Sequence, residues 1–270
     1  MTNPPVSPFT RGANFVAPCV AAALCSLGHL QAALVNPGFE TGDLSGWSTL
    51  GTVAVSTGKT YSDTVDVSPG ASRIVAPNPG SFLAHLIASS EMTASEIALK
   101  MRISEATLEG SNDGTDAAFG SLISQTVSAS AGDKFTFNWN FVERDYAEFN
   151  DWSFFGVSFN DGPSAVSRLA SVIEVGPVED KHSENTTVNG WKTFEYEIAA
   201  AGNYTFHFGV VNANDGLASS ELWVDAPERS ISGTGISTIP EPGSVLGLGL
   251  LLGSGLFVRS RRRAAQNASV

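Results

Sequence analysis

Between residues 34 and 229, apolar and polar positions alternate in short runs that turn residues separate. Val53 and Val55 alternate with small or polar neighbours, and residues 80–88 are nearly all apolar. Short runs with a period of two, bounded by Gly, Asn, Asp and Ser, are typical of β-strands. The pattern therefore predicts an all-β fold, a β-sandwich of about eight to ten strands.

Two stretches share one pattern, an Ala-Gly-Asx turn followed by a strand with alternating aromatic residues. The turns are Ala131-Gly132-Asp133 and Ala201-Gly202-Asn203. The aromatic positions are Phe135, Phe137, Trp139 and Phe141 in the first strand, and Tyr204, Phe206 and Phe208 in the second. Because successive side chains point to opposite faces, we expect the aromatic face in the core and the Thr, Asn and His face outward. His207 is then expected at the surface or at an edge.

Residues 93–110 fit two patterns. Alternating apolar positions at 97, 99, 101 and 103 have the period of a strand. Thr93 and Glu96, however, have the spacing of a capping box, and good helix formers follow them. We expect one short helix here, packed across one end of the sandwich.

The N-terminal residues 1–32 have the features of a secretory signal peptide. Arg11 supplies a positive charge, residues 15–30 are apolar, and small residues allow cleavage near Ala32. Cleavage would remove Cys19 and Cys25 and leave no thiol in the mature chain. A retained anchor is the alternative; a lipoprotein is disfavoured because no small residue directly precedes either cysteine.

The C-terminal residues 239–263 combine three elements. Pro240, Glu241 and Pro242 come first, an uncharged apolar run at 245–258 follows, and a basic cluster ends it at Arg259, Arg261, Arg262 and Arg263. As a single transmembrane helix the run would be about 21 Å long, shorter than the roughly 30 Å hydrocarbon core. The arginines would keep residues 264–270 in the cytoplasm. Residues 230–238 form the expected flexible linker, and an ordinary tail anchor is the alternative.

This order of elements resembles the PEP-CTERM sorting signal of Gram-negative bacteria that make exopolysaccharide. The resemblance implies that an exosortase, a membrane transpeptidase, processes the chain near Pro240, Glu241 and Pro242. It also implies export, an intermediate anchored in the inner membrane, and final placement at the cell surface or in the extracellular matrix.

The segment Asn36-Pro37-Gly38-Phe39-Glu40, which leads to Trp47, resembles the opening of galactose-binding-like jelly rolls and of secreted carbohydrate-binding modules. The resemblance implies a jelly-roll sandwich over residues 33–229, with a first strand in the opening segment and Trp47 closing an edge. It also implies a structural calcium ion, for which the matching oxygen ligands are Asn36, Glu40, Asp43 and Asp225. The alternative is that these are solvated turn and strand-end residues.

Charge and motifs narrow the function classes. The net charge is −12, and because the two ends carry five of the 15 basic residues, the body between them is more acidic than the whole chain. Such a surface repels phosphate backbones, so we expect no nucleic-acid partner. The body contains neither a His-Glu-x-x-His motif nor a Gly-x-Ser-x-Gly motif, so we expect a non-catalytic protein that requires no cofactor. A glycoside hydrolase stays open, because its two carboxylates need not be close in sequence.

Sugar binding would need exposed rings, and four tryptophans of the body are candidates: Trp47, Trp152, Trp191 and Trp223. Asp151 and Trp152 are the favoured ligand-binding pair, although core packing is the alternative for each tryptophan. Together these patterns predict an exported, surface-sorted, non-catalytic protein of the exopolysaccharide or biofilm matrix. The alternatives are a carbohydrate-active enzyme on the same scaffold and an adhesin or ice-binding-type surface protein.

Overall fold

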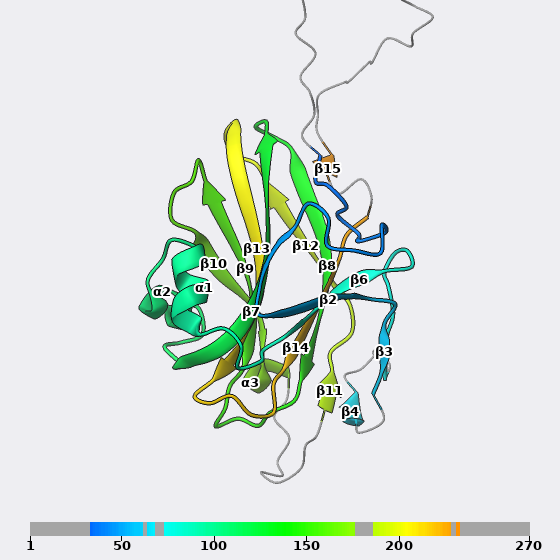
Figure 1. Ribbon diagram of the computed structural model, residues 1–270, viewed down its shortest axis with the longest axis vertical. Helices are drawn as coiled ribbons and strands as arrows, with labels where there is room; N and C mark the ends of the chain where they lie inside the picture. Colours follow the sequence, from blue (N-terminus) through cyan, green and yellow to red (C-terminus); the bar gives the residue numbers. More distant parts are fainter. Residues whose placement is uncertain (1–32, 62–63, 68–72, 176–185, 228–230, 233–270) are drawn as a thin grey trace, which may run out of the picture. The chain divides into compact units, whose positions relative to one another are not determined.

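The computed structural model describes residues 33–61, 64–67, 73–175, 186–227 and 231–232 (Figure 1). The expected signal peptide, the Pro240–Pro242 motif, the apolar run at 245–258 and the basic cluster all lie outside these ranges. Within them, no helix combines the length and apolar character needed to cross a membrane.

The described residues form a β-sandwich of two large sheets, which confirms the expected all-β class. The first sheet contains, in spatial order, β1 (Ser48–Leu50), β7 (Ala117–Ala129), β13 (Gly202–Ala213), β9 (Trp152–Phe159) and β10 (Ala165–Ser171). The path of the second sheet runs through β2 (Thr52–Ser56), β6 (Leu83–Ile87), β14 (Glu221–Asp225), β8 (Lys134–Glu143), β11 (Thr186–Val188) and β4 (Thr64–Val67). Two more strands, β12 (Lys192–Glu197) and β15 (Ile231–Ser232), also pair with β8, and β3 (Lys59–Thr60) pairs with β5 (Ile74–Val75). β15 lies inside the expected linker, so the sheet includes part of that segment.

The core lies between the two sheets and is built from the alternating aromatic positions. On β8 and β13, respectively, Phe135 and Phe206 have ring centroids 4.2 Å apart, and Phe137 and Phe208 have centroids 4.7 Å apart in an edge-to-face arrangement. All four are fully buried. Tilted and edge-to-face contacts of this kind add to the free energy gained by burying the rings.

The two Ala-Gly-Asx turns occupy equivalent places, because each carries the chain from one sheet to the other. The turn at 131–133 connects β7 to β8, and the turn at 201–203 connects β12 to β13. Gly132 has φ +87°, a conformation that glycine adopts without steric cost. The repeated sequence pattern therefore marks two crossovers that place aromatic strands face to face.

The opening segment differs from the expectation, because residues 33–47 contain turns and no strand. Asn36 and Phe39 both adopt positive φ, which breaks an extended run. Trp47 does close an edge of the core as expected: it is buried, its ring centroid lies 5.3 Å from that of Phe39, and its indole N–H donates to the Asn36 carbonyl.

The ambiguous stretch forms two helices, α1 (Ala94–Lys100) and α2 (Glu105–Gly110), and α3 (Val172–Val175) follows β10. The capping box is present: the Thr93 side chain accepts from the Glu96 N–H, and the Glu96 side chain accepts from the Thr93 N–H. The expectation of one short helix across one end of the sandwich was therefore wrong, because two helices form and they lie on a sheet face. The helices cover part of the outer face of the five-stranded sheet (Figure 1), where Ile97, Met101 and Leu108 pack against strand residues.

Candidate functional site

The outer face of the five-stranded sheet is divided into a covered apolar part and an open polar part. Under α1 and α2, Leu122, Phe154 and Val211 from β7, β9 and β13 join the apolar cluster of the helices. Further along the same strands, the outward positions change to Ser, Thr and His. The helices therefore leave a groove on this face with a volume of about 430 Å³.

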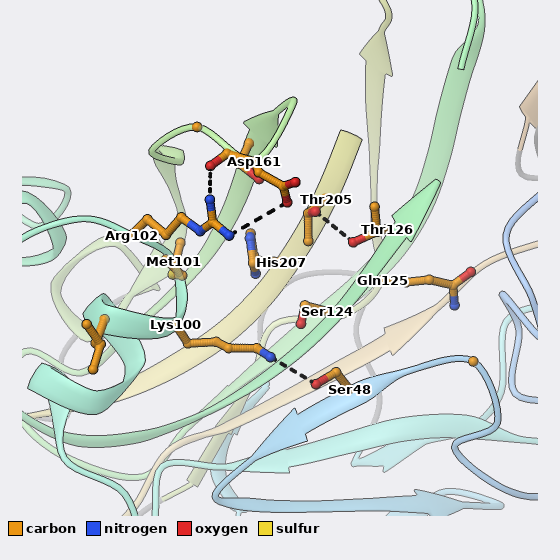
Figure 2. A pocket seen from close by; sticks show the side chains of 14 residues that line it. Ser48, Lys100, Met101, Arg102, Ser124, Gln125, Thr126, Asp161, Thr205 and His207 are labelled. Carbon is orange, nitrogen blue, oxygen red and sulfur yellow. Dashed lines mark hydrogen bonds and ion pairs between the residues drawn. The ribbon is translucent and has the colours of Figure 1, made fainter. Parts of the chain in front are cut away.

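Two rows of polar residues cross the floor of this groove from strand to strand (Figure 2). In the first row, Ser48 on β1 is the register partner of Ser124 on β7, which is the partner of His207 on β13. In the second row, Thr126 on β7, Thr205 on β13 and Ser158 on β9 are successive partners. We call the surface formed by these six residues, together with Lys100 and Arg102, the sheet groove.

The hydroxyls of Thr126 and Thr205 form a hydrogen bond 2.8 Å long across the second row (Figure 2). Thr126 is exposed and Thr205 is partly exposed. A threonine hydroxyl has one donor and two acceptor positions, so each keeps capacity for a further partner. The row thus presents hydroxyls that can exchange hydrogen bonds with a polyhydroxylated ligand.

His207 lies at the end of the first row and corrects an expectation. It is on the outward face of β13 as predicted, yet it is only 3% exposed rather than a surface histidine. Gly156, its register partner on β9, makes room for the ring and for α1, because a Cβ there would lie 2.5 Å from Met101 Cε and 3.3 Å from His207 Cβ. Among the described residues, His207 Nδ1 has no hydrogen-bond partner.

The charge state of His207 follows from these surroundings. Burial, with a smaller contribution from the positive charge of Lys100, lowers the pKa of His207 to about 4. The imidazole is therefore neutral at pH 7. It adds a polar ring, and no charge, to the floor of the groove.

The basic residues of the groove come from the end of α1. Arg102 has φ +58°, its N–H donates to the Leu99 carbonyl, and the N–H of Ile103 donates to the Ala98 carbonyl. These are the two bonds of a Schellman motif, in which a residue in the left-handed conformation ends the helix. Glycine is the usual residue at this position, and here it is arginine.

The side chains of Lys100 and Arg102 extend along the groove (Figure 2). Lys100 Nζ donates to Ser48 Oγ over 3.2 Å. Arg102 donates to the backbone carbonyl of Asp161, and its Nη2 lies 3.8 Å from Asp161 Oδ1. The sequence contained only a partial signal for the floor, because Ser124, Thr126 and Ser128 alternate on β7 with Gln125 and Val127, of which only the second is apolar. It held none for the basic side chains, which depend on where the helix ends.

Asp151 and Trp152, the expected ligand-binding pair, lie away from the groove opening. Both are fully buried: Trp152 packs under the helices, and the Asp151 carboxylate accepts hydrogen bonds from the N–H groups of Ala213 and Ser220. Trp47 and Trp223 are also buried, and Trp191 is partly exposed. Among the described residues that line the groove there is no aromatic ring other than the His207 imidazole, so this surface offers hydrogen bonds rather than ring stacking.

Each of the four residues expected to hold calcium makes hydrogen bonds to other groups of the protein. Glu40 accepts from the N–H groups of Ser81 and Phe82, and Asp225 accepts from those of Asn78 and Ala226. Asp43 accepts from the Thr41 hydroxyl, and Asn36 donates to the Asp43 carbonyl. In the described part of the chain, no group of three or more His, Cys, Asp or Glu side chains is placed to hold a metal ion.

Burial raises the pKa of Asp225 to about 7, against the opposing effect of its two N–H partners, and the charge of Glu40 raises it further. The carboxylates of Glu40 and Asp225 therefore interact electrostatically, although Glu40 lies in the opening segment and Asp225 at the end of β14. The calcium ion itself stays a prediction.

A second cavity, of about 610 Å³, lies on the other sheet beside Glu221. Glu221 is 3% exposed, and its carboxylate accepts from Lys59 Nζ at 2.7 Å and from Tyr61 OH at 2.5 Å. His85 Nε2 lies 2.7 Å from the same carboxylate, and the His85 ring stacks on Trp223 with centroids 3.7 Å apart.

These contacts decide what Glu221 can do. Burial opposes its ionisation, but the bonds to His85, Lys59 and Tyr61 prevail and lower the pKa of Glu221 to about 2. A general acid for glycoside hydrolysis needs a raised pKa and a second carboxylate nearby. Among the described residues that line this cavity, Glu221 is the one carboxylate, so the cluster is an ion-pair centre that joins β3, β6 and β14.

Comparison with known proteins gives likenesses only at the level of structure. No protein-family model matches the chain, and no curated protein matches its sequence. Among solved structures, TmCBM61 in complex with β-1,4-galactotriose is 17% identical with a TM-score of 0.39, covering 72% of this chain and 94% of that one. The K3 cleaved adhesin domain of Lys-gingipain from Porphyromonas gingivalis W83 is 11% identical with a TM-score of 0.35, covering 72% and 96%. The CBM22-1 xylan-binding domain of Paenibacillus barcinonensis Xyn10C is 11% identical with a TM-score of 0.31, covering 72% and 88%. At such TM-scores the likeness assigns neither a family nor a function to this chain.

Proposed function

We propose that this protein is an exported, non-catalytic glycan-binding protein and that the sheet groove is its binding site. The observation that carries the proposal is the double row of outward Ser, Thr and His side chains on four neighbouring strands. Ser48 and Thr126 are exposed and Thr205 is partly exposed, whereas Ser124, Ser158 and His207 lie deeper in the floor and are 4%, 6% and 3% exposed. Rigid strands fix the spacing of these groups, about 4.8 Å between strands, and so present an ordered set of hydrogen-bond partners. Ligands rich in hydroxyls satisfy such a set.

The groove is suited to binding without chemistry. Its charged lining residues among those described are Lys100, Arg102 and Asp161, so it has a single carboxylate, and that one lies at an exposed turn. The two-carboxylate arrangement of a glycoside hydrolase is not met by this lining. Binding through hydrogen bonds alone, without a stacked ring, fits modest affinity for a repeated polymer rather than tight binding of a single sugar.

Sorting and location belong to the same proposal. The order of Pro240-Glu241-Pro242, the apolar run and the arginine cluster supports processing by an exosortase and placement in the exopolysaccharide matrix of a Gram-negative bacterium. Mass spectrometry of the protein recovered from the cell surface tests this step. A C-terminus near residue 242 is expected, and recovery of the intact tail from the surface would contradict it.

Glycan binding is tested with an array of neutral and acidic oligosaccharides, together with a reducing-sugar release assay on the bound ones. Stoichiometric binding without release is expected. Release of reducing ends without stable binding would favour the carbohydrate-active enzyme. Absence of both binding and release would contradict the proposal.

A further inference from the structure

The charged residues of the sheet groove differ in sign from most of the protein. The chain has 27 acidic and 15 basic residues and a net charge of −12. Inside the groove, two of the three charged lining residues are basic. An acidic surface repels anions at long range, so a groove that binds them needs its own cations.

In the described part of the chain, neither Lys100 nor Arg102 forms a close ion pair with a carboxylate. Lys100 bonds to the Ser48 hydroxyl, which leaves its charge without a carboxylate partner there. Arg102 has five N–H donors, and its hydrogen bond goes to a backbone carbonyl. Its 3.8 Å separation from Asp161 Oδ1 exceeds a hydrogen-bond length, and the side chains are 58% and 75% exposed, so this pair is weak.

The backbone at Arg102 gives an independent reason to assign its side chain a role. The left-handed conformation costs a non-glycine residue on the order of 1 kcal/mol or more, and glycine would end the helix without that cost. Arg102 at φ +58° is therefore strained, and its exposed, weak contacts with Asp161 do little to offset that strain. Strained positions that persist in this way are frequent at binding sites.

We propose that the sheet groove binds an acidic glycan, whose sugars carry carboxylates that Lys100 and Arg102 recognise. This inference rests on the proposed glycan-binding function and adds the class of ligand. The planar guanidinium of Arg102 can donate two parallel hydrogen bonds to a carboxylate, and the Lys100 ammonium adds a second positive charge beside it. The hydroxyl rows hold the rest of the sugar.

His207 supplies a spectroscopic readout of this assignment. The charged groups that face it are Lys100 and Arg102 from the end of α1 and Asp161 from the turn after β9. A bound carboxylate beside Lys100 favours the imidazolium form and raises the pKa of His207 above its value in the free protein. A bound neutral sugar excludes water without adding charge, and so does not raise that pKa.

The test uses full-length protein and oligomers of galacturonate, glucuronate, mannuronate and guluronate, each as the free acid and as its methyl ester. Calorimetry at pH 7 should give roughly tenfold tighter binding of at least one acid than of its ester. Arg102→Gly and Lys100→Gln should each reduce that acid-to-ester ratio. Lys134→Gln, which removes an exposed lysine of the other sheet, should leave the ratio unchanged.

The outcomes separate the two claims. Equal binding of acid and ester would overturn the acidic class and leave glycan binding standing. A ratio that survives both groove variants would overturn the roles of Lys100 and Arg102. If no acid, ester or neutral oligosaccharide binds, the proposed function fails as well.

Discussion

The guanidinium of Arg102 donates a hydrogen bond to the backbone carbonyl of Asp161, which links the end of α1 to the turn between β9 and β10. Both residues have positive φ, +58° and +60°. Two strained turns from distant parts of the sequence therefore meet at the rim of the sheet groove (Figure 2).

Replacing Arg102 with glycine should leave the free energy of unfolding unchanged to within about 1 kcal/mol. Relief of the left-handed strain, on the order of 1–2 kcal/mol, offsets the greater unfolded-state entropy of glycine, about 0.5–1 kcal/mol. Urea unfolding measures the difference. The matched control is Leu99→Gly, one residue from the helix end and 76% exposed, which should lose about 1 kcal/mol. A loss at Arg102 as large as that at Leu99 would contradict the strain argument.

Glu221→Gln should destabilise the protein by about 3 kcal/mol, because it leaves Lys59 and Arg144 beside a neutral side chain. The pKa of Glu221 is lowered from 4.5 to about 2, so its ionisation stabilises the fold above pH 4.5, and this stability is lost as the pH falls towards 2. Thermal unfolding between pH 2 and pH 6 should show a smaller pH dependence in the variant. Equal slopes for the two proteins would rule out the ion-pair role.

The raised pKa of Asp225 should make the stability of the fold depend on pH in the opposite direction. Its pKa is raised from 3.8 to about 7, so the folded state favours the protonated carboxyl, and stability falls as the pH rises from about 4 through 7. Asp225→Asn should remove this part of the dependence. Nuclear magnetic resonance titration of the Asp225 carboxyl gives a direct check, and a midpoint near 4 would be incompatible with the burial described.

Calcium binding through Asn36, Glu40, Asp43 and Asp225 has a simple test. A bound cation would offset the repulsion between Glu40 and Asp225 and keep Asp225 ionised. The unfolding temperature at pH 8 should then be higher in millimolar calcium than in EGTA, with Asp225→Asn reducing the difference. The same unfolding temperature in calcium and in EGTA would contradict calcium binding by these four residues.

The aromatic strands and the capping box could be predicted from the sequence because both depend on local spacing. Phe135, Phe206 and the pair Thr93 and Glu96 lie where the patterns put them. The alternation also assigned His207 to the outward face. It could not tell that α1 covers that face, since packing between residues about 100 positions apart leaves no periodic signal.

The absence of a sequence signal for long-range packing also explains why the candidate site could not be predicted. Trp152 follows a charged loop, which favoured an exposed ring, but the helices bury it on the outer face of β9. The residues of the groove, by contrast, are small hydroxyl side chains with no distinctive motif. They become a site only because β1, β7, β13 and β9 lie side by side and because α1 ends beside them.

The claim that glycans bind the sheet groove is tested most directly with the double variant Thr126→Val and Thr205→Val. Valine keeps the shape and strand preference of threonine, and removing both hydroxyls leaves neither one unpaired. The measurement is calorimetric affinity for the oligosaccharide that the wild type binds most tightly, with Thr193→Val on β12 as the control. Affinity should be at least roughly tenfold lower in the double variant and unchanged in the control. Wild-type affinity in the double variant would contradict that claim.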